Sequence, residues 1–272
     1  MMRSLWTAAS GMIAQQNNVD TIANNLSNVN TVGYKTETAE FKSLLYQEMV
    51  SKTTSANGEN KPIGAQVGLG VRNSSVTSHF TQGAFQPTDS QFDFAIDGEG
   101  FFALRTLDGE MAYTRNGNFY LAVSPEGGHM LTNSEGLAVL DSNGNPIYFE
   151  EGLSSEDITI DSDGEVCLPD EKNNPVKTGV KIALFQFSNP SGLKKTSNSM
   201  YLETEASGVA MNESEYTNLK KSNVKQGYLE RSNVQVADEM VNLIVAQRAY
   251  ELNSKAITTS DEMMQTANNL KK

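Results

Sequence analysis

Cysteine and histidine are almost absent from this chain of 272 residues, which has one cysteine, Cys167, and two histidines. A single cysteine excludes an internal disulfide and a cysteine-based zinc site, and two histidines leave little material for another transition-metal centre. The sequence has neither the Gly-x-Ser-x-Gly elbow of serine hydrolases nor the His-Glu-x-x-His motif of zinc proteases. We therefore predict no catalytic site, no metal and no cofactor, so that the chain is not an enzyme.

Positive charge is also scarce, and apolar runs are short. The 21 Lys and Arg residues face 33 Asp and Glu residues, which gives a formal net charge of −12. No basic patch is large enough to bind nucleic acid through its phosphates. The longest apolar runs are too short for a membrane span. The N-terminus lacks the charged start and apolar run of a secretory signal peptide, so we expect no cleaved signal.

Glycine and proline are missing from most of both ends. All seven prolines lie between Pro62 and Pro190, and 18 of the 21 glycines lie between Gly58 and Gly208. These residues interrupt helices and mark turns. The distribution predicts helices at the two ends of the chain and a turn-rich middle.

The N-terminal zone has a heptad pattern and an outer face almost without charge. Between Arg3 and Lys35 the only charged residue is Asp20, whereas a solvent-facing helix surface normally has Lys and Glu. One interpretation is a half-buried helix with a weakly polar outside; the favoured one is a helix surrounded by other copies in an assembly. The apolar positions that recur at heptad spacing are Leu5, Met12, Val19, Ile22, Leu26 and Val29.

The C-terminal zone has a second heptad pattern. The sequence from Ser232 to Gln235 fits a capping box, and Asp238 and Glu239 follow where a helix dipole favours acidic residues. Two heptad helices at opposite ends predict one coiled coil that closes the chain on itself. The residues predicted to form its second half are Val236, Leu243, Tyr250, Ile257 and Met264.

The middle of the chain has the pattern of β structure. Phe101 to Leu104 form a buried-type run, and turn signals at 141–145 and 161–165 each lie between short apolar runs, which predicts two hairpins. A further strand is predicted over 180–187. Short strands with a turn about every ten residues indicate an antiparallel sandwich or barrel-like domain.

The fold class predicted is therefore α+β, with a discontinuous helical coiled-coil domain from both chain ends and an inserted, mainly antiparallel β domain. Its four parts are an N-terminal helix (1–35), an arm or linker (36–75), a β-rich outer domain (76–225) and a C-terminal helix (226–272). The stretch from Met49 to Val71 is polar and poor in aromatics, so in isolation it should be disordered or extended.

Three features resemble binding or reactive sites without meeting their requirements. The loop from Asp161 has its glycine at position 4, whereas an EF-hand needs it at position 6. Gly98 and Gly100 lack the third glycine of a dinucleotide loop and precede a strand-like run. The favoured interpretation is that both are turns, and that Cys167 is a buried thiol in a strand.

Several separated stretches resemble one family. The sequence is similar to bacterial flagellar rod and hook proteins at its N-terminal signature, its central motifs and its C-terminal region. The N-terminal motif residues shared with that family are Asn24, Asn25, Asn28, Gly33, Tyr34 and Lys35. The other stretches are Ala9-Ser10-Gly11-Met12, Phe94–Phe102, Tyr113–Phe119, Ser232-Asn233-Val234, Gln247–Tyr250 and Asp261–Met263.

This resemblance implies a structural subunit that polymerises helically into the drive shaft linking motor to hook. Its implied partners are copies of itself, other rod proteins and the hook protein, the flagellar type III export apparatus, and further out a ring bushing and peptidoglycan. It implies a place in the flagellar basal body, within the cell envelope. The terminal helices would pack as the inner domain, the β-rich middle would pack outside it, and an extended arm would fall near 46–71.

Within the family, the distal-rod branch is the most similar. Gly68-Leu69-Gly70-Val71-Arg72, Phe80-Thr81-Gln82-Gly83 and Gly227-Tyr228-Leu229-Glu230 resemble that branch. A proximal rod or hook subunit is the first alternative. An envelope glycan-binding module built on the β domain is the second.

Overall fold

The computed structural model describes residues 2–50, 65–124, 127–149, 158–169, 175–216 and 218–270. The middle of the predicted arm, 51–64, lies outside the described residues. The chain divides into two compact units. Unit 1 comprises Met1–Ser27, Glu37–Ser78 and Gln235–Lys272, and unit 2 comprises Asn28–Thr36 and His79–Val234.

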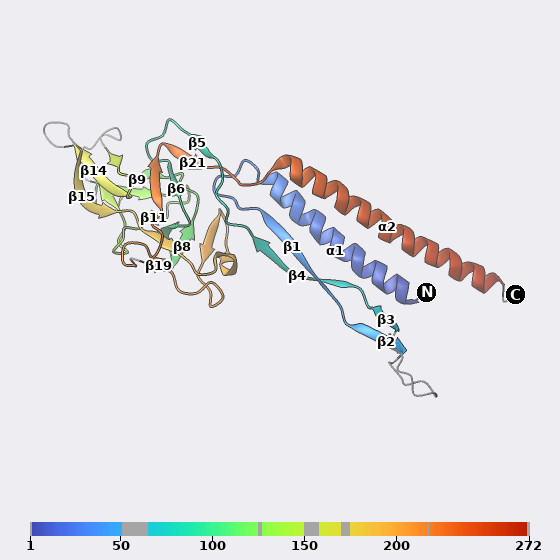
Figure 1. The fold of residues 1–272 in the computed structure, drawn as a ribbon. Helices are drawn as coiled ribbons and strands as arrows, with labels where there is room; N and C mark the ends of the chain where they lie inside the picture. The colour runs from blue at the N-terminus through green and yellow to red at the C-terminus, as the bar shows by residue number, and fades with distance from the viewer. Residues whose placement is uncertain are drawn as a thin grey trace. The chain divides into compact units, whose positions relative to one another are not determined.

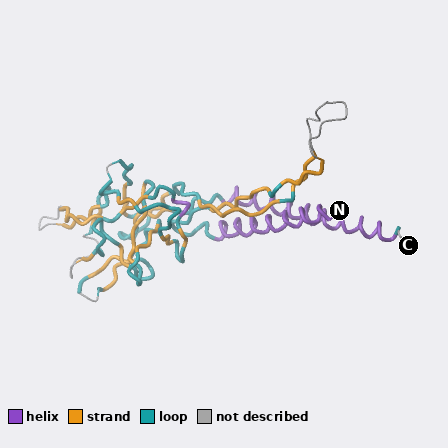
Figure 2. The backbone as a smooth tube through the Cα atoms, turned by 90° about the horizontal axis from the view of Figure 1, so that it is seen from below, coloured by secondary structure: helices purple, strands orange, loops and turns teal. Residues whose placement is uncertain are grey.

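Unit 1 contains two long helices, α1 (Met2–Ser27) and α2 (Val236–Asn269), which lie side by side in both views (Figures 1 and 2). A helix at each end of the chain is confirmed, over fewer residues than the predicted 1–35 and 226–272. Asp238 and Glu239 occupy the first turn of α2, as expected.

The predicted capping box at the start of α2 is wrong. The helix begins at Val236, and Gln235 at its N-cap makes no side-chain cap hydrogen bond. Ser232 Oγ instead accepts a hydrogen bond from the Val234 N–H at 3.2 Å, which forms a local turn before the helix starts. A serine hydroxyl satisfies a nearby backbone donor in a turn as readily as at a helix N-terminus.

A two-stranded ribbon completes unit 1. Strand β1 (Glu37–Ser43) pairs antiparallel with β4 (Val71–Ser78), and β2 (Tyr46–Val50) pairs with β3 (Ala65–Gly68). Figure 1 shows β1 and β4 running beside α1. The described parts of the predicted arm are thus paired strands, with their register broken by irregularities at Glu40/Phe41 and Glu48/Val50.

Unit 2 is built from short antiparallel strands. Among the described residues its largest sheet has ten strands, with the order β12-β10-β11-β7-β8-β18-β17 and with β9, β16 and β19 attached to the side. The strands are β5 (Phe85–Pro87), β6 (Phe94–Asp97), β7 (Phe101–Arg105), β8 (Met111–Thr114), β9 (Tyr120–Val123), β10 (His129–Thr132), β11 (Ala138–Val139), β12 (Tyr148–Phe149), β13 (Thr159–Ile160), β14 (Glu165–Pro169), β15 (Pro175–Lys181), β16 (Leu184–Gln186), β17 (Lys194–Lys195), β18 (Met200–Leu202), β19 (Met211–Asn212), β20 (Asn223–Gln226) and β21 (Tyr228–Glu230). The predicted α+β class with mainly antiparallel strands is therefore confirmed.

The two predicted hairpin turns are present, but the strand predicted over 180–187 is divided. Ile160 pairs with Val166 across the 161–165 turn, and Leu140 bridges Pro146 across the 141–145 turn. The chain changes partners between β15 and β16, where the Ile182 N–H donates to Gly164 O and the Ala183 N–H donates to Leu140 O. Periodicity along the sequence does not report such a change of partner.

Strand β7 has both faces buried, which explains its uninterrupted apolar run. Phe102 and Leu104 belong to one core cluster, while Phe101 and Ala103 belong to a second. All four side chains are 0% exposed. Cys167 is a buried free thiol in β14, as the sequence predicts.

Candidate assembly interface

Small residues set the closest approach of α1 and α2. A Cβ added at Gly11 would lie 2.9 Å from Asn253 Nδ2, and Ser4 Oγ lies 3.4 Å from Ser260 Oγ. Ala14 and Ala246 are 3% and 1% exposed. Small residues allow two helix backbones to approach closely. A heptad pattern of large apolar residues does not include these positions.

The predicted seam residues are only partly covered within one chain. Ile22 is buried, whereas Val236 and Tyr250 are 41% and 43% exposed. Half-buried positions are Leu5, Met12, Val19, Leu26, Val29, Leu243, Ile257 and Met264.

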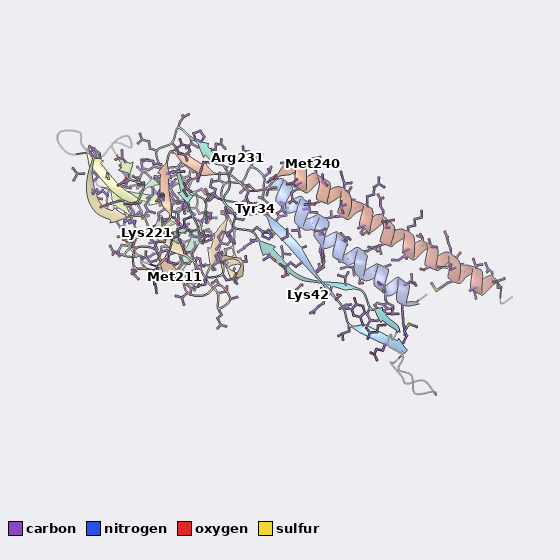
Figure 3. The ribbon with its side chains drawn as sticks, viewed as in Figure 1. Tyr34, Lys42, Met211, Lys221, Arg231 and Met240 are labelled. Carbon is purple, nitrogen blue, oxygen red and sulfur yellow. The ribbon has the colours of Figure 1, made fainter. Side chains whose placement is uncertain are left out.

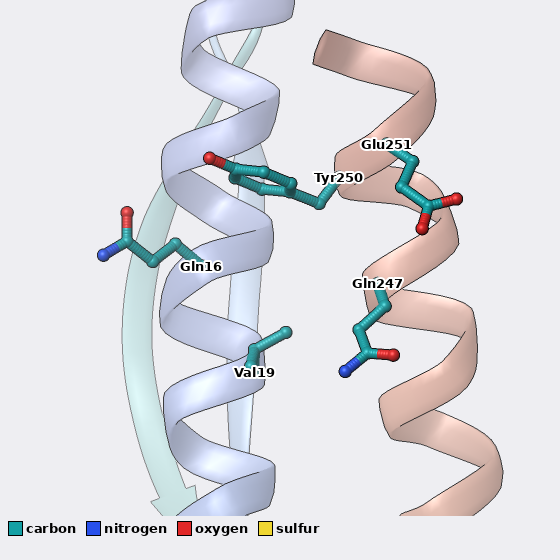
Figure 4. A pocket seen from close by; sticks show the side chains of 5 residues that line it. All are labelled: Gln16, Val19, Gln247, Tyr250 and Glu251. Atoms are coloured by element: carbon teal, nitrogen blue, oxygen red, sulfur yellow. The ribbon is translucent and has the colours of Figure 1, made fainter. Parts of the chain in front are cut away.

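An open pocket of about 400 Å³ lies between the two helices (Figure 4). It is lined by Gln16 and Val19 of α1 and by Gln247, Tyr250 and Glu251 of α2. Two residues of the predicted seam, Val19 and Tyr250, therefore line a gap. Helix packing inside one chain leaves this part of the seam unfilled.

A stripe of exposed apolar residues follows α2. Val241, Val245 and Leu252 are 59%, 62% and 68% exposed, and their spacing of four and seven places them on one helix face. Ile244 and Met240, the latter labelled in Figure 3, are also more than half exposed. We call these five residues the α2 stripe. Exposed apolar surface of this kind, here beside the exposed Arg248–Glu251 ion pair, indicates a protein interaction site.

The ribbon is attached to α1 at one serine of the N-terminal signature. Ser10 Oγ accepts a hydrogen bond from the Val71 N–H at 3.3 Å. Gly70 has φ +113°, and a Cβ there would lie 2.2 Å from Ser10 Oγ. Ser10 therefore contacts the ribbon while the next residue, Gly11, faces α2, so two adjacent signature residues organise two different contacts.

Asn25 joins three elements of unit 1. Its Oδ1 accepts from the Glu37 N–H of β1 at 2.9 Å, and its Nδ2 donates to Glu37 O at 2.7 Å. The same amide group donates to Glu239 Oε2 of α2 at 3.3 Å. Asn25 is 1% exposed and Glu239 is 7% exposed. A residue that the motif singled out thus ties α1 to both the ribbon and α2.

We expect Asn25→Ala to reduce the free energy of unfolding by about 1–3 kcal/mol, because it removes the hydrogen bonds of Asn25 to the half-buried backbone of Glu37 and to the buried Glu239 carboxylate. Thermal unfolding followed by far-ultraviolet circular dichroism measures the loss. Asn17→Ala, at an exposed position of the same helix, is the matched control and should change stability by no more than about 0.5 kcal/mol. Equal effects of the two variants would contradict the assigned role.

Lys35 belongs to a buried ion cluster in unit 2. Its Nζ lies 2.6 Å from Glu230 Oε1, and Arg115 Nη1 lies 3.2 Å from Glu230 Oε2. The three side chains are 0%, 2% and 1% exposed. Burial lowers the pKa of Lys35; the Glu230 carboxylate opposes this effect and the Arg115 guanidinium adds to it. We call Lys35, Arg115 and Glu230 the ion cluster.

Three of the remaining motif residues, Asn28, Gly33 and Tyr34, belong to the stretch that leads to Lys35. Asn28 Oδ1 accepts from Thr31 Oγ1 at 3.0 Å, and the Tyr34 N–H donates to Thr31 O at 3.3 Å. Gly33 is buried with φ +69°. Asn24 is exposed on α1. Figure 3 labels Tyr34.

Arg115 and Glu230 lie in stretches that resemble the family, but the sequence alone assigns a role to neither. The sequence feature that could have indicated their role is the presence of charged residues inside stretches that are otherwise rich in glycine, asparagine and apolar residues. Lys35 and Glu230 are 195 positions apart, so no local pattern connects them.

The described parts of the chain contain no group of three or more His, Cys, Asp or Glu side chains arranged to hold a metal ion. None of the helices within those parts is both long and apolar enough to cross a membrane. The features above are helix contacts, an unburied apolar stripe and buried polar ties between segments. Such features are typical of a structural protein, and the exposed apolar stripe indicates a surface for protein interaction.

Comparison with known proteins identifies the family. Residues 5–35 match the model for flagella basal body rod proteins, 95–168 match the D1 domain of flagellar hook proteins FlgE/F/G, and 225–270 match the C-terminal region of flagellar basal body rod FlgEFG proteins. The chain belongs to this flagellar rod family, whose members are structural proteins and not enzymes.

Its relatives include flagellar basal-body rod proteins FlgG along their whole length. The FlgG of Borreliella burgdorferi is 45% identical over 278 residues that cover all of both chains. The FlgG of Buchnera aphidicola from Schizaphis graminum is 40% identical, over 99% of this chain and all of the relative. The FlgG of Bacillus subtilis is 37% identical over the full length of both chains. The predicted similarity to the rod family, with FlgG as the related distal rod protein, is confirmed.

Proposed function

We propose that this protein is a distal rod subunit that polymerises helically into the drive shaft between the flagellar motor and the hook. The observation that most directly supports this is the α2 stripe, because unit 1 of a single chain leaves it exposed beside a partly filled helix seam. A surface of one copy that fits a different surface of the next, without closing into a ring, generates a helical filament.

The predicted seam is part of the same proposal. Leu5, Met12, Val19, Ile22, Leu26 and Val29 of the N-terminal side, with Val236, Leu243, Tyr250, Ile257 and Met264 of the C-terminal side, would form an inner coiled-coil domain. Its half-buried positions would be completed by neighbouring copies. The division into 1–35, 36–75, 76–225 and 226–272 is the proposed organisation, with the ribbon as the stiffening arm.

The proposed partners are other copies of this chain, the other rod proteins, the hook protein and the flagellar type III export apparatus. A ring bushing and peptidoglycan would surround the shaft in the cell envelope. The almost uncharged outer face of α1 supports this role, because burying it among other copies desolvates few ions.

Val245→Asp tests the proposal. Val245 is 62% exposed, so the change should alter the stability of the monomer by no more than about 0.5 kcal/mol. In a polymer the same carboxylate would be buried without a partner, so we expect rod assembly and motility to be lost. Electron microscopy of isolated basal bodies measures assembly, and circular dichroism of the monomer measures stability.

Leu107→Asp is the matched control, since Leu107 is 94% exposed on unit 2. The control should leave assembly of the shaft intact. Basal bodies with complete rods built from the Val245→Asp protein would refute a role for the α2 stripe in polymerisation.

A further inference from the structure

Glu230 touches three segments that are far apart in the sequence. Its Oε1 accepts hydrogen bonds from Lys35 Nζ at 2.6 Å and from the Gly83 N–H at 2.8 Å. Its backbone oxygen accepts from the Gly33 N–H at 2.9 Å. Its Oε2 is 3.2 Å from Arg115 Nη1. One residue thus contacts the N-terminal segment, the segment that follows the ribbon, and the β domain.

The Asn233 side chain forms a second set of hydrogen bonds between the same segments. Its Oδ1 accepts from the Thr36 N–H at 2.8 Å and from Thr36 Oγ1 at 2.7 Å. Its Nδ2 donates to His79 O at 2.9 Å and to Thr81 Oγ1 at 2.7 Å. Lys35 closes the arrangement by donating to Thr81 O at 2.8 Å.

These ties fall within unit 2, on three segments that we call the connecting segments: 33–36, 79–83 and 230–233. Each lies within a few residues of a point where the chain passes from one unit to the other in sequence. Backbone hydrogen bonds add to the side-chain ties, because the His79 N–H donates to Thr36 O and the Arg231 N–H donates to Ala84 O.

The charges of the ion cluster make these ties interdependent. Two cations share one carboxylate, and all three side chains are no more than 2% exposed. Arg115 donates further to Gly98 O at 2.8 Å, and its Nε is buried without a hydrogen-bond partner among the described residues. If Glu230 leaves, two like charges remain together away from water, which is strongly unfavourable. The packing of segments 33–36 and 79–83 therefore depends on segment 230–233.

We propose that the ion cluster and Asn233 form a conformational lock that couples the three connecting segments, so that they open and close as one cooperative unit. The N-terminal segment cannot stay packed against the rest of unit 2 once the C-terminal segment is released. The C-terminal segment depends on the N-terminal one in the same way. Both ends of the chain must therefore reach unit 2 before either is held there. This property follows from the ties themselves and is independent of the function proposed above.

Hydrogen exchange of the full-length monomer, read by mass spectrometry, tests the lock. With Glu230→Gln, we expect amide protection to fall by roughly two to four orders of magnitude in all three connecting segments together. Glu213→Gln is the matched control. Glu213 is a carboxylate of unit 2 that is 4% exposed and accepts hydrogen bonds only from the neutral groups of Gln186 and Ser222 among the described residues. It should lose protection near 213–222 and leave 33–36 unchanged.

A second variant keeps the test decisive if Glu230→Gln does not fold. Asn233→Ala removes the five side-chain hydrogen bonds to Thr36, His79 and Thr81 and leaves every charge paired as before. It should speed exchange at Gly83, which Asn233 does not touch, as well as at Thr36 and His79. Faster exchange confined to 230–234 in either variant, with Gly33 and Gly83 still protected, would overturn the lock. Because the measurement uses the monomer, this outcome would leave the rod function untouched.

Discussion

Replacing Glu230 with glutamine should reduce the free energy of unfolding of unit 2 by about 3–5 kcal/mol. The change preserves the size of the side chain, removes its charge and replaces one acceptor oxygen with an NH2 donor. Lys35 and Arg115 then repel one another without a counter-charge, at positions that are 0% and 2% exposed. Urea unfolding followed by near-ultraviolet circular dichroism measures the loss, because Tyr113 and Tyr201 are buried in the core of unit 2.

Lys35→Met provides the comparison that separates charge from packing. It removes the surplus cation and leaves Glu230 paired with Arg115, so no uncompensated charge is created. The expected cost is about 1–2 kcal/mol, for the hydrogen bonds to Glu230 and Thr81 O. The double variant should cost less than the sum of the two single changes, because the residues are in direct contact. If Lys35→Met proved as damaging as Glu230→Gln, the excess positive charge would not be the dominant effect.

The helices were predictable because their sequence signals are local. Gly11 is the only glycine in α1, which contains no proline, and α2 contains neither glycine nor proline. The start of α2 was less predictable, because Ser232 satisfies a backbone donor in a turn and leaves the helix N-terminus without a side-chain cap. Capping signals identify a nearby boundary, but several donors within a few residues can use the same hydroxyl.

The ribbon was not predictable as paired strands because it lacks a buried face. Most side chains of β1 and β4 are exposed, so no alternation of apolar and polar residues marks the strands. Cross-strand hydrogen bonds stabilise the pair instead, as from Thr77 Oγ1 to Glu40 Oε1 at 2.7 Å. The paired strands are distant in sequence, and composition predicted an extended or disordered segment only over 49–71.

The sequence predicted several residues of the candidate site, but it did not predict which residues they contact. Resemblance to the family singled out Asn25, Gly33 and Lys35, and the structure places each at a close contact. Their partners Glu239, Arg115 and Glu230 come from other parts of the chain. A single sequence contains no record of which distant residues pair, so these contacts had to come from the fold.

Gly33→Ala should be among the most damaging changes of one methyl group in this protein. Gly33 has φ +69°, which costs a residue with a side chain roughly 1–3 kcal/mol. Its added Cβ would also lie 2.7 Å from Asn116 N and 2.8 Å from Arg115 C, both backbone atoms that cannot rotate away. Overpacking of this kind costs about another 1–3 kcal/mol. The displaced segment would weaken the hydrogen bond from the Gly33 N–H to Glu230 O.

Gly136→Ala separates the two causes. Gly136 has φ +82° with no atom within 4 Å of an added Cβ, so it has the backbone strain without the overlap. Urea unfolding of both variants should show a loss at Gly33 that exceeds the loss at Gly136 by about 1–3 kcal/mol. Equal losses would mean that backbone conformation alone requires glycine at position 33. A larger loss at Gly33 would mean that the motif keeps a glycine there so that the N-terminal segment can lie directly against the backbone next to Arg115.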